Sequence, residues 1–140
     1  MPSNATRQPG LDNLDDLLDG VRKAGLPTRL STHGSVRPVP GSLDIALYRI
    51  TQEMLTNALR HGDSNLVEIE LHYRQESVSV TASNGVLPGR QPLGESAGSA
   101  RGLAGIRKRA ALFDGTVEYG PDPTGTRWWT AVTFPVGGQR

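Results

Sequence analysis

Residues 43–60 contain neither glycine nor proline, and this run constrains the fold more than any other part of the chain. Apolar side chains recur through it at intervals of three and four residues, which predicts a long amphipathic helix with one broad buried face. These apolar residues are Leu47, Ile50, Met54, Leu55, Ala58 and Leu59. Ser42 stands just before the run, after Pro40 and Gly41, and we expect its hydroxyl to cap the helix.

Two runs of strict alternation follow this helix. Apolar and polar residues alternate through residues 67–71 and 78–82, which predicts two half-buried strands joined by a hairpin at 74–77. Similar patterns predict strands at 28–32, 116–119 and 127–134, an extended segment at 36–39, and helices at 11–23 and 103–113. Asp114-Gly115 ends the last helix with a glycine suited to a left-handed cap.

This order of elements predicts an α/β fold of the two-layer sandwich type, with a mixed sheet and helices on one face. A chain of 140 residues fits a single core. We expect the domain to cover residues 11–140, and the polar residues 1–10 to form a disordered tail. Residues 86–101 are rich in glycine, proline, serine and alanine and lack apolar periodicity, so we expect a lid over a ligand.

Composition excludes several classes of function. Fifteen basic and fourteen acidic residues give a formal net charge of +1, which provides no broad field for nucleic acid. The chain has no cysteine, so disulfides and thiolate metal sites are excluded. It has no apolar run of the length of a signal peptide or a membrane span. We therefore expect a cytoplasmic domain, either free or at the intracellular end of a membrane-anchored parent.

Four polar residues form a stripe along the long predicted helix: Glu53, Asn57, Arg60 and His61. Such a stripe is commonly a solvated helix face, and the spacing alone favours that interpretation. The alternative is a phosphate site in which Asn57 supplies an oxygen ligand to Mg²⁺, Glu53 acts as a base, and Arg60 faces a phosphate.

Two other segments offer groups that can bind a nucleotide. Residues 101–105 lie where the expected lid runs into a helix, and free N–H groups at a helix N-terminus attract phosphate, although many helices begin beside glycine. Asn84-Gly85 closes the second central strand. Alternation points Asn84 to the buried side, where its amide can read the edge of a base or start a turn.

The remaining candidates carry weaker signals. His33, His61 and His72 are scattered through a turn, a helix end and a strand, and their spacing predicts no metal site. For His33 and His72 the pattern favours ordinary surface residues. Trp128 and Trp129 are expected in strand pairing and the core, which is the usual place of aromatic residues in a short strand.

Together these segments resemble a known family. Residues 48–61, YRITQEMLTNALRH, closely resemble the N box of sensor histidine kinases, in the branch of the nitrate-responsive and membrane-fluidity sensors. Residues 102–110 resemble the later glycine box of that branch, and 115–117 with 125–126 resemble its closing hairpin. The resemblance implies the Bergerat ATP-binding fold, shared with gyrase, the heat-shock chaperone and mismatch-repair ATPases, which holds ATP and Mg²⁺ under a mobile lid.

The resemblance also implies roles for particular residues. Asn57 matches the magnesium ligand, Glu53 the catalytic carboxylate, and Arg60 and His61 the basic pair near the phosphates. The remaining positions implied to bind the nucleotide are Asn84, Gly85, Gly102, Leu103, Gly105 and Thr126.

The sequence departs from the family at two places. Asn84 takes the place of an aspartate that accepts a hydrogen bond from the adenine amino group. An amide oxygen can accept the same bond but lacks the charge that strengthens it, so weaker base recognition is expected. Ala100-Arg101 precedes Gly102 where relatives often have glycine and histidine, and the lid lacks a second glycine soon after Gly85.

None of the three histidines lies in the phosphoacceptor motif of this branch, so we do not expect this chain to phosphorylate itself. The resemblance implies that the phosphoacceptor lies on a separate helical dimerisation domain of the parent kinase, and that a response regulator is the next partner. Two alternatives remain. One is a degenerate regulatory module that no longer binds nucleotide, and the other is an anti-sigma-factor serine kinase of the same fold.

Overall fold

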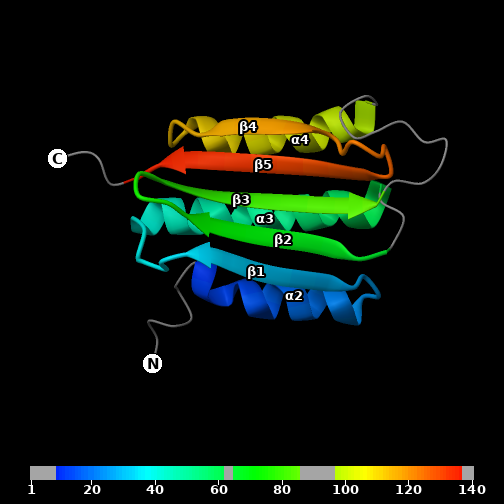
Figure 1. The fold of residues 1–140 in the computed structure, drawn as a ribbon, viewed down its shortest axis with the longest axis horizontal. Coiled ribbons are helices and arrows are strands. Elements are labelled where there is room, and N and C mark those ends of the chain that lie inside the picture. Colours follow the sequence, from blue (N-terminus) through cyan, green and yellow to red (C-terminus); the bar gives the residue numbers. More distant parts are fainter. Residues whose placement is uncertain (1–8, 62–64, 86–96, 137–140) are drawn as a thin grey trace.

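The computed structural model describes residues 9–61, 65–85 and 97–136. A five-stranded sheet has the order β1-β2-β3-β5-β4 (Figure 1). Strand β1 pairs with β2 in parallel, and the other neighbours are antiparallel, which confirms the predicted mixed sheet. In chain order the elements are η1 (Leu11–Asn13), α2 (Leu14–Lys23), β1 (Thr28–Gly34), α3 (Gly41–His61), β2 (Val67–Tyr73), β3 (Ser77–Gly85), α4 (Ala97–Ala111), β4 (Thr116–Pro121) and β5 (Arg127–Pro135).

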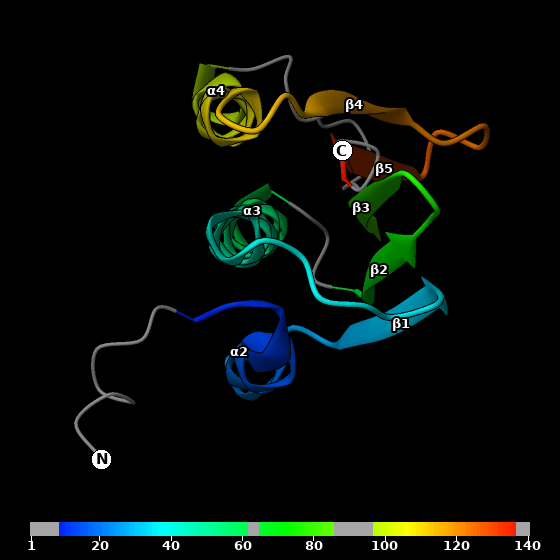
Figure 2. The ribbon, with the colours of Figure 1, turned by 90° about the vertical axis from the view of Figure 1, so that its left-hand side faces the viewer.

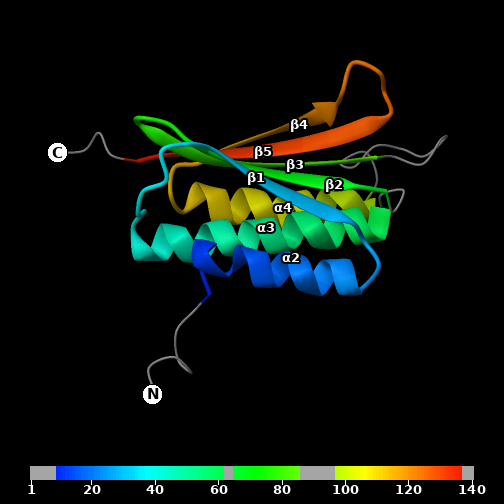
Figure 3. The ribbon, with the colours of Figure 1, turned by 60° about the horizontal axis from the view of Figure 1, so that its bottom comes forward.

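Helices α2, α3 and α4 all lie on one face of the sheet, with α3 in the middle (Figures 2 and 3). The core fills the space between the two layers, because alternate residues of β2, β3 and β5 point toward the helices. Its fully buried side chains include Leu47 and Ile50 of α3, Ile69 of β2 and Phe134 of β5. This is the predicted two-layer sandwich. No helix in the described part of the chain is long and apolar enough to cross a membrane.

The start of α4 differs from the sequence prediction. The helix begins at Ala97, whereas apolar periodicity placed its start at residue 103. Residues 97–101, assigned from the sequence to the lid, are therefore helical, and residues 86–96 of that lid lie outside the described residues. Periodicity detects only helix turns that bury a face. Once a helix has formed, each added residue gains a hydrogen bond, so the turn at residues 97–102 can extend the helix without an apolar pattern of its own.

The helix ends and one loop also differ from expectation. The Asp44 N–H donates to the Pro40 carbonyl at 2.8 Å, so Pro40 is the cap of α3 and Ser42 lies inside its first turn. After α4 the left-handed residue is Asp114, with φ 61°, and not Gly115. Position 115 has no room for a side chain, because a Cβ there would lie 2.5 Å from Cε1 of Phe134. Residues 36–39, expected to be extended, form no strand.

Candidate functional site

Most of the residues singled out from the sequence lie at one end of the molecule. The last turns of α3, the end of β3, the start of β5 and the first half of α4 all point to the same side, on the right in Figure 1. Asn84 and Gly85 are the last two residues of β3 and pair with Trp128 and Arg127 of β5. The topology therefore brings together segments that are far apart in the sequence.

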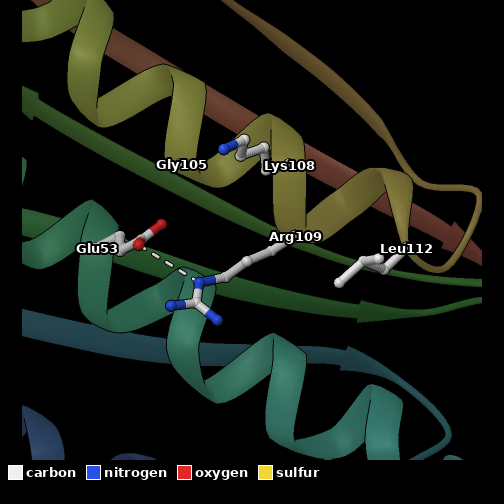
Figure 4. Close-up of a pocket in the computed structure, with 5 residues that line it drawn as sticks. All are labelled: Glu53, Gly105, Lys108, Arg109 and Leu112. Atoms are coloured by element: carbon white, nitrogen blue, oxygen red, sulfur yellow. Dashed lines mark hydrogen bonds and ion pairs between the residues drawn. The ribbon is translucent and has the colours of Figure 1, made fainter.

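Glu53 lies at the contact between α3 and α4 (Figure 4). Its Oε2 is 3.3 Å from Nε of Arg109, which reaches across from α4. Its Oε1 is buried and has no hydrogen-bond partner among the described residues. Gly105 of α4 faces the same carboxylate, since a Cβ on Gly105 would lie only 3.3 Å from Oε2. One carboxylate oxygen is thus paired with a cation, and the other is available to accept a bond.

A cavity of about 420 Å³ opens beside this carboxylate. Glu53, Gly105, Lys108, Arg109 and Leu112 line it. Its volume is in the range of small-molecule sites, and its lining surface is mostly apolar. Sequence reasoning singled out Glu53 and Gly105 and missed Lys108 and Arg109. The basic run Arg107-Lys108-Arg109 inside the glycine-box segment was the signal that could have found them.

Asn57 and Arg60 continue the stripe of Glu53 toward the end of α3. Asn57 is half-buried one turn after Glu53, and Arg60 is exposed one turn further on. His61 is the last residue of α3, and its side chain lies outside the described part of the structure. The oxygens of Glu53 and Asn57 therefore lie along one helix face, as the spacing predicted.

Asn84 points toward the helices, as the alternation predicted, and only 7% of it is exposed. Its Nδ2 donates to the Gly85 carbonyl at 2.9 Å, so Oδ1 is the atom of this amide that can accept a bond from a ligand. Its cross-strand neighbour Trp128 is also buried, which confirms the expectation for this residue. The Trp128 indole N–H has no hydrogen-bond partner among the described residues. The amide of Asn84 and the indole N–H of Trp128 thus belong to two buried residues that are direct cross-strand neighbours.

Trp128 is fixed by a row of contacts that ends on α4. Its ring stacks on Tyr119 of β4, with centroids 5.8 Å apart. Arg107 of α4 lies over the Tyr119 ring, 5.2 Å from its centroid, and donates to the Tyr119 hydroxyl at 2.8 Å. Trp129 points to the opposite face of the sheet and is half-buried. These contacts link helix α4 to strand β4 and, through Tyr119, to Trp128, the cross-strand neighbour of Asn84.

The glycines predicted to bind phosphate lie inside a helix and not at its N-terminus. Gly102 and Gly105 are inside α4, beyond its first four N–H groups, so their N–H groups are in the range of intrahelical bonding. The expectation of free N–H groups there is wrong for this structure, because α4 starts earlier than residue 103. Leu103 is buried in the core with 3% exposure, which fixes the face that α4 turns to the sheet.

Thr126 lies in the turn between β4 and β5, immediately before Arg127, the partner of Gly85. Its N–H donates to Oδ1 of Asp122 at 3.2 Å. The Thr124 hydroxyl donates to the same oxygen at 2.8 Å. These bonds, that of Thr124 first, outweigh desolvation and lower the pKa of Asp122 below its ordinary value. The turn is thus organised around one carboxylate at the end where the other site residues gather.

Residues 43–138 match the family described as histidine kinase-, DNA gyrase B-, and HSP90-like ATPase. The chain belongs to this family. It is 32% identical over 101 residues to the sensor histidine kinase LnrJ of Bacillus subtilis, which covers 72% of the chain and 24% of that protein. It is 29% identical over 96 residues to the oxygen sensor histidine kinase NreB of Staphylococcus carnosus, covering 66% of the chain and 26% of that protein.

A solved structure supports the fold independently. The blue-light activated histidine kinase of Erythrobacter litoralis EL346 superposes with a TM-score of 0.70 at 15% identity, over 94% of this chain and 43% of that chain. The fold is thus the Bergerat fold of histidine kinase ATPase domains, which confirms the resemblance read from the sequence. The chain spans about a quarter of the length of the curated relatives it matches.

Proposed function

We propose that this chain binds Mg-ATP and presents the γ-phosphate to a histidine on a separate helical dimerisation and phosphoacceptor domain, from which a response regulator receives it. The observation that carries the proposal is the carboxylate of Glu53, which has a buried Oε1 without a partner among the described residues, one turn before Asn57. Family membership and the gathering of Asn84, Gly85 and the end of α3 on one side support it.

The residues present suit Mg²⁺. This ion prefers oxygen ligands, keeps several waters, and is usually held by one or two protein oxygens together with substrate phosphates. Asn57 offers an amide oxygen, and Oε1 of Glu53 is a buried acceptor that a water or an ion would satisfy. When bound, Mg²⁺ would neutralise charge on the phosphate oxygens. We therefore assign Asn57 as the metal ligand and Glu53 as the carboxylate that orients a water molecule or accepts a proton.

The chain's other residues would position the nucleotide. Oδ1 of Asn84 would accept a hydrogen bond from the adenine amino group, because Nδ2 of the same amide is bonded to Gly85. This bond is neutral, so we expect weaker adenine binding than an aspartate would give. Arg60, exposed near the end of α3, can approach a phosphate. His61, Gly102, Leu103, Gly105 and Thr126 stay proposals from the family resemblance.

A degenerate regulatory module is the second candidate, and one contact favours it. Arg109 already pairs with Oε2 of Glu53, so the carboxylate of the proposed site has a partner within the chain. A module of this kind would keep the fold and would not bind nucleotide.

Calorimetric titration with a non-hydrolysable ATP analogue, with and without Mg²⁺, separates the two candidates. We expect Mg²⁺-dependent binding, and about tenfold weaker binding or more for Asn57→Ala, which corresponds to about 1.4 kcal/mol. Thr56→Ala is the matched control, since Thr56 is the exposed neighbour on the same helix. Absence of binding at millimolar analogue would favour the degenerate module. Phosphate transfer is then tested by adding the helical domain of the parent kinase.

A further inference from the structure

A second group of ligating side chains lies on the face of the sheet opposite the helices. His33 of β1 is the register partner of His72 of β2, and Glu70 lies two residues before His72 on the same face. The two imidazole rings stack with centroids 4.6 Å apart and planes inclined by 10°. Nε2 of His72 is 3.0 Å from Oε1 of Glu70. Ligand atoms of all three residues lie within 4.8 Å of one another.

Sequence spacing predicted no metal site at these histidines, and the reason is topological. His33 and His72 are far apart along the chain and are neighbours only because β1 pairs with β2 in parallel register. The helix-facing residues of β2 are buried in the core, and the other face of the two strands carries the polar groups. Figure 3 shows β1 and β2 side by side, with the helices beneath them.

We propose that His33, His72 and Glu70 form a binding site for a divalent transition-metal ion of the Zn²⁺ class. Two imidazole nitrogens and one carboxylate oxygen suit Zn²⁺, Ni²⁺ or Cu²⁺ far better than Mg²⁺. Three protein ligands leave a position for water, as in open zinc sites. The site is distinct from the nucleotide site on the helical face and does not depend on nucleotide binding.

The two stacked rings must turn before a nitrogen of each can point at one ion, because their planes are inclined by only 10°. With zinc–nitrogen bonds of about 2.0–2.1 Å, tetrahedral geometry places two ligand atoms about 3.3 Å apart. The three ligand atoms here already lie within 4.8 Å of one another. His33 is exposed, and the side chains of His72 and Glu70 are 24% and 42% exposed, so rotation about χ1 and χ2 is open to them. The existing bond between Nε2 of His72 and Oε1 of Glu70 keeps the carboxylate beside the imidazole, and the entering ion would displace the proton that these two atoms share.

The neighbouring cations are engaged by other groups. Arg74 donates from Nη1 to Oγ of Ser79, the cross-strand partner of His72, at 3.1 Å. Arg29 pairs with Glu68 at 2.8 Å, one step further along the same face. Bound metal would join edge strand β1 to β2 and, since the unfolded chain lacks the preformed site, would stabilise the fold.

The test is a titration of the metal-free chain with ZnCl₂ and, separately, MgCl₂ at neutral pH, followed by calorimetry and thermal unfolding. We expect saturable binding of one Zn²⁺ with a rise in Tm, and no such effect of Mg²⁺. His33→Ala and His72→Ala each remove a direct ligand and should weaken Zn²⁺ binding by at least about tenfold. Losing a residue that only hydrogen-bonds to a ligand already costs about this much. Glu68→Gln is the matched control, because it removes a carboxylate of the same strand and face that pairs with Arg29.

Imidazole NMR signals show where the metal binds, since the chain has only three histidines. Zn²⁺ should shift the ring signals of His33 and His72 and leave those of His61 in place. If His72→Ala does not fold, His72→Gln and the wild-type ring signals replace it. The proposal is overturned if wild type shows no saturable Zn²⁺ binding up to the millimolar range. It is equally overturned if the histidine variants bind like wild type, or if only His61 responds.

Discussion

Glu53 on α3 and Arg109 on α4 meet across the helix interface, with Oε2 3.3 Å from Nε. Their side chains are 33% and 44% exposed, so solvent screens the pair, and pairs of this kind contribute about 0.2–1 kcal/mol to stability. The contact therefore matters less for the fold than for the proposed chemistry, in which Arg109 would compete with a water or an ion for the carboxylate of Glu53.

Arg109→Met tests this competition. Methionine keeps the length of the side chain and removes the charge, so we expect a loss of less than about 1 kcal/mol in the free energy of unfolding. We expect the nucleotide analogue to bind at a lower Mg²⁺ concentration, because Glu53 has lost its cationic partner. Urea unfolding and calorimetry at several Mg²⁺ concentrations measure the two effects. Lys23→Met, which removes an exposed cation from α2, is the control. An unchanged Mg²⁺ dependence would contradict the proposed competition.

Gly105→Ala should separate helix stability from the position of Glu53. Alanine in place of glycine inside a helix gains about 1 kcal/mol. At Gly20 of α2 an added Cβ meets nothing within 4 Å, so Gly20→Ala should gain the full amount. At Gly105 the Cβ would lie 3.3 Å from Oε2 of Glu53, so the carboxylate must move. We expect Gly105→Ala to gain less stability than Gly20→Ala and to weaken Mg-dependent binding of the analogue. Equal gains with intact binding would be evidence against this packing.

The turn after α4 offers a test of packing against backbone freedom. Gly115→Ala would put a Cβ 2.5 Å from the ring of Phe134, and overpacking of a core costs about 1–3 kcal/mol. Asp114→Gly is the matched variant, because Asp114 holds the left-handed conformation with φ 61°. It should change stability by less than about 1 kcal/mol, since glycine adopts this conformation freely but has more freedom when unfolded. Thermal unfolding of both variants decides which residue is required to be glycine, and a larger loss in Asp114→Gly would refute our assignment.

The sheet and α3 could be predicted because burial leaves a periodic trace in the sequence. Alternation in 67–71 and 78–82, and the apolar stripe of 43–60, each report a face that must avoid water. The stripe of Glu53 and Asn57 was equally visible. The start of α4 was not, because residues 97–102 leave no apolar pattern and their helicity depends on the turns that follow.

The sequence alone could not predict contacts between segments that are far apart along the chain. The pairing of Arg109 with Glu53 depends on how α4 packs against α3, and the stacking of His33 on His72 depends on the register of β1 with β2. Local spacing carries no information on either. Asn84 is an intermediate case, since alternation predicted its direction and only the structure showed its cross-strand neighbour Trp128.

The turn organised by Asp122 predicts a specific dependence of stability on pH. Its pKa is lowered below the ordinary value of 3.8, first by the Thr124 hydroxyl and then by the N–H groups of Arg127, Gly125 and Thr126. Because the folded pKa is the lower one, the unfolded chain binds more protons in this range. The stabilising contribution is therefore complete above about pH 5 and is lost as the pH falls through the folded pKa.

Asp122→Asn keeps the shape and an acceptor oxygen but removes the charge. We expect wild type to be more stable than this variant at neutral pH, with a difference that stays constant down to about pH 5 and shrinks below pH 4. Urea unfolding of both proteins from pH 7 to pH 2.5 measures it. Glu118→Gln, which removes an exposed negative charge from β4, controls for the change in net charge. A difference between wild type and Asp122→Asn that grows toward acid pH would mean that the charge of Asp122 does not stabilise the turn.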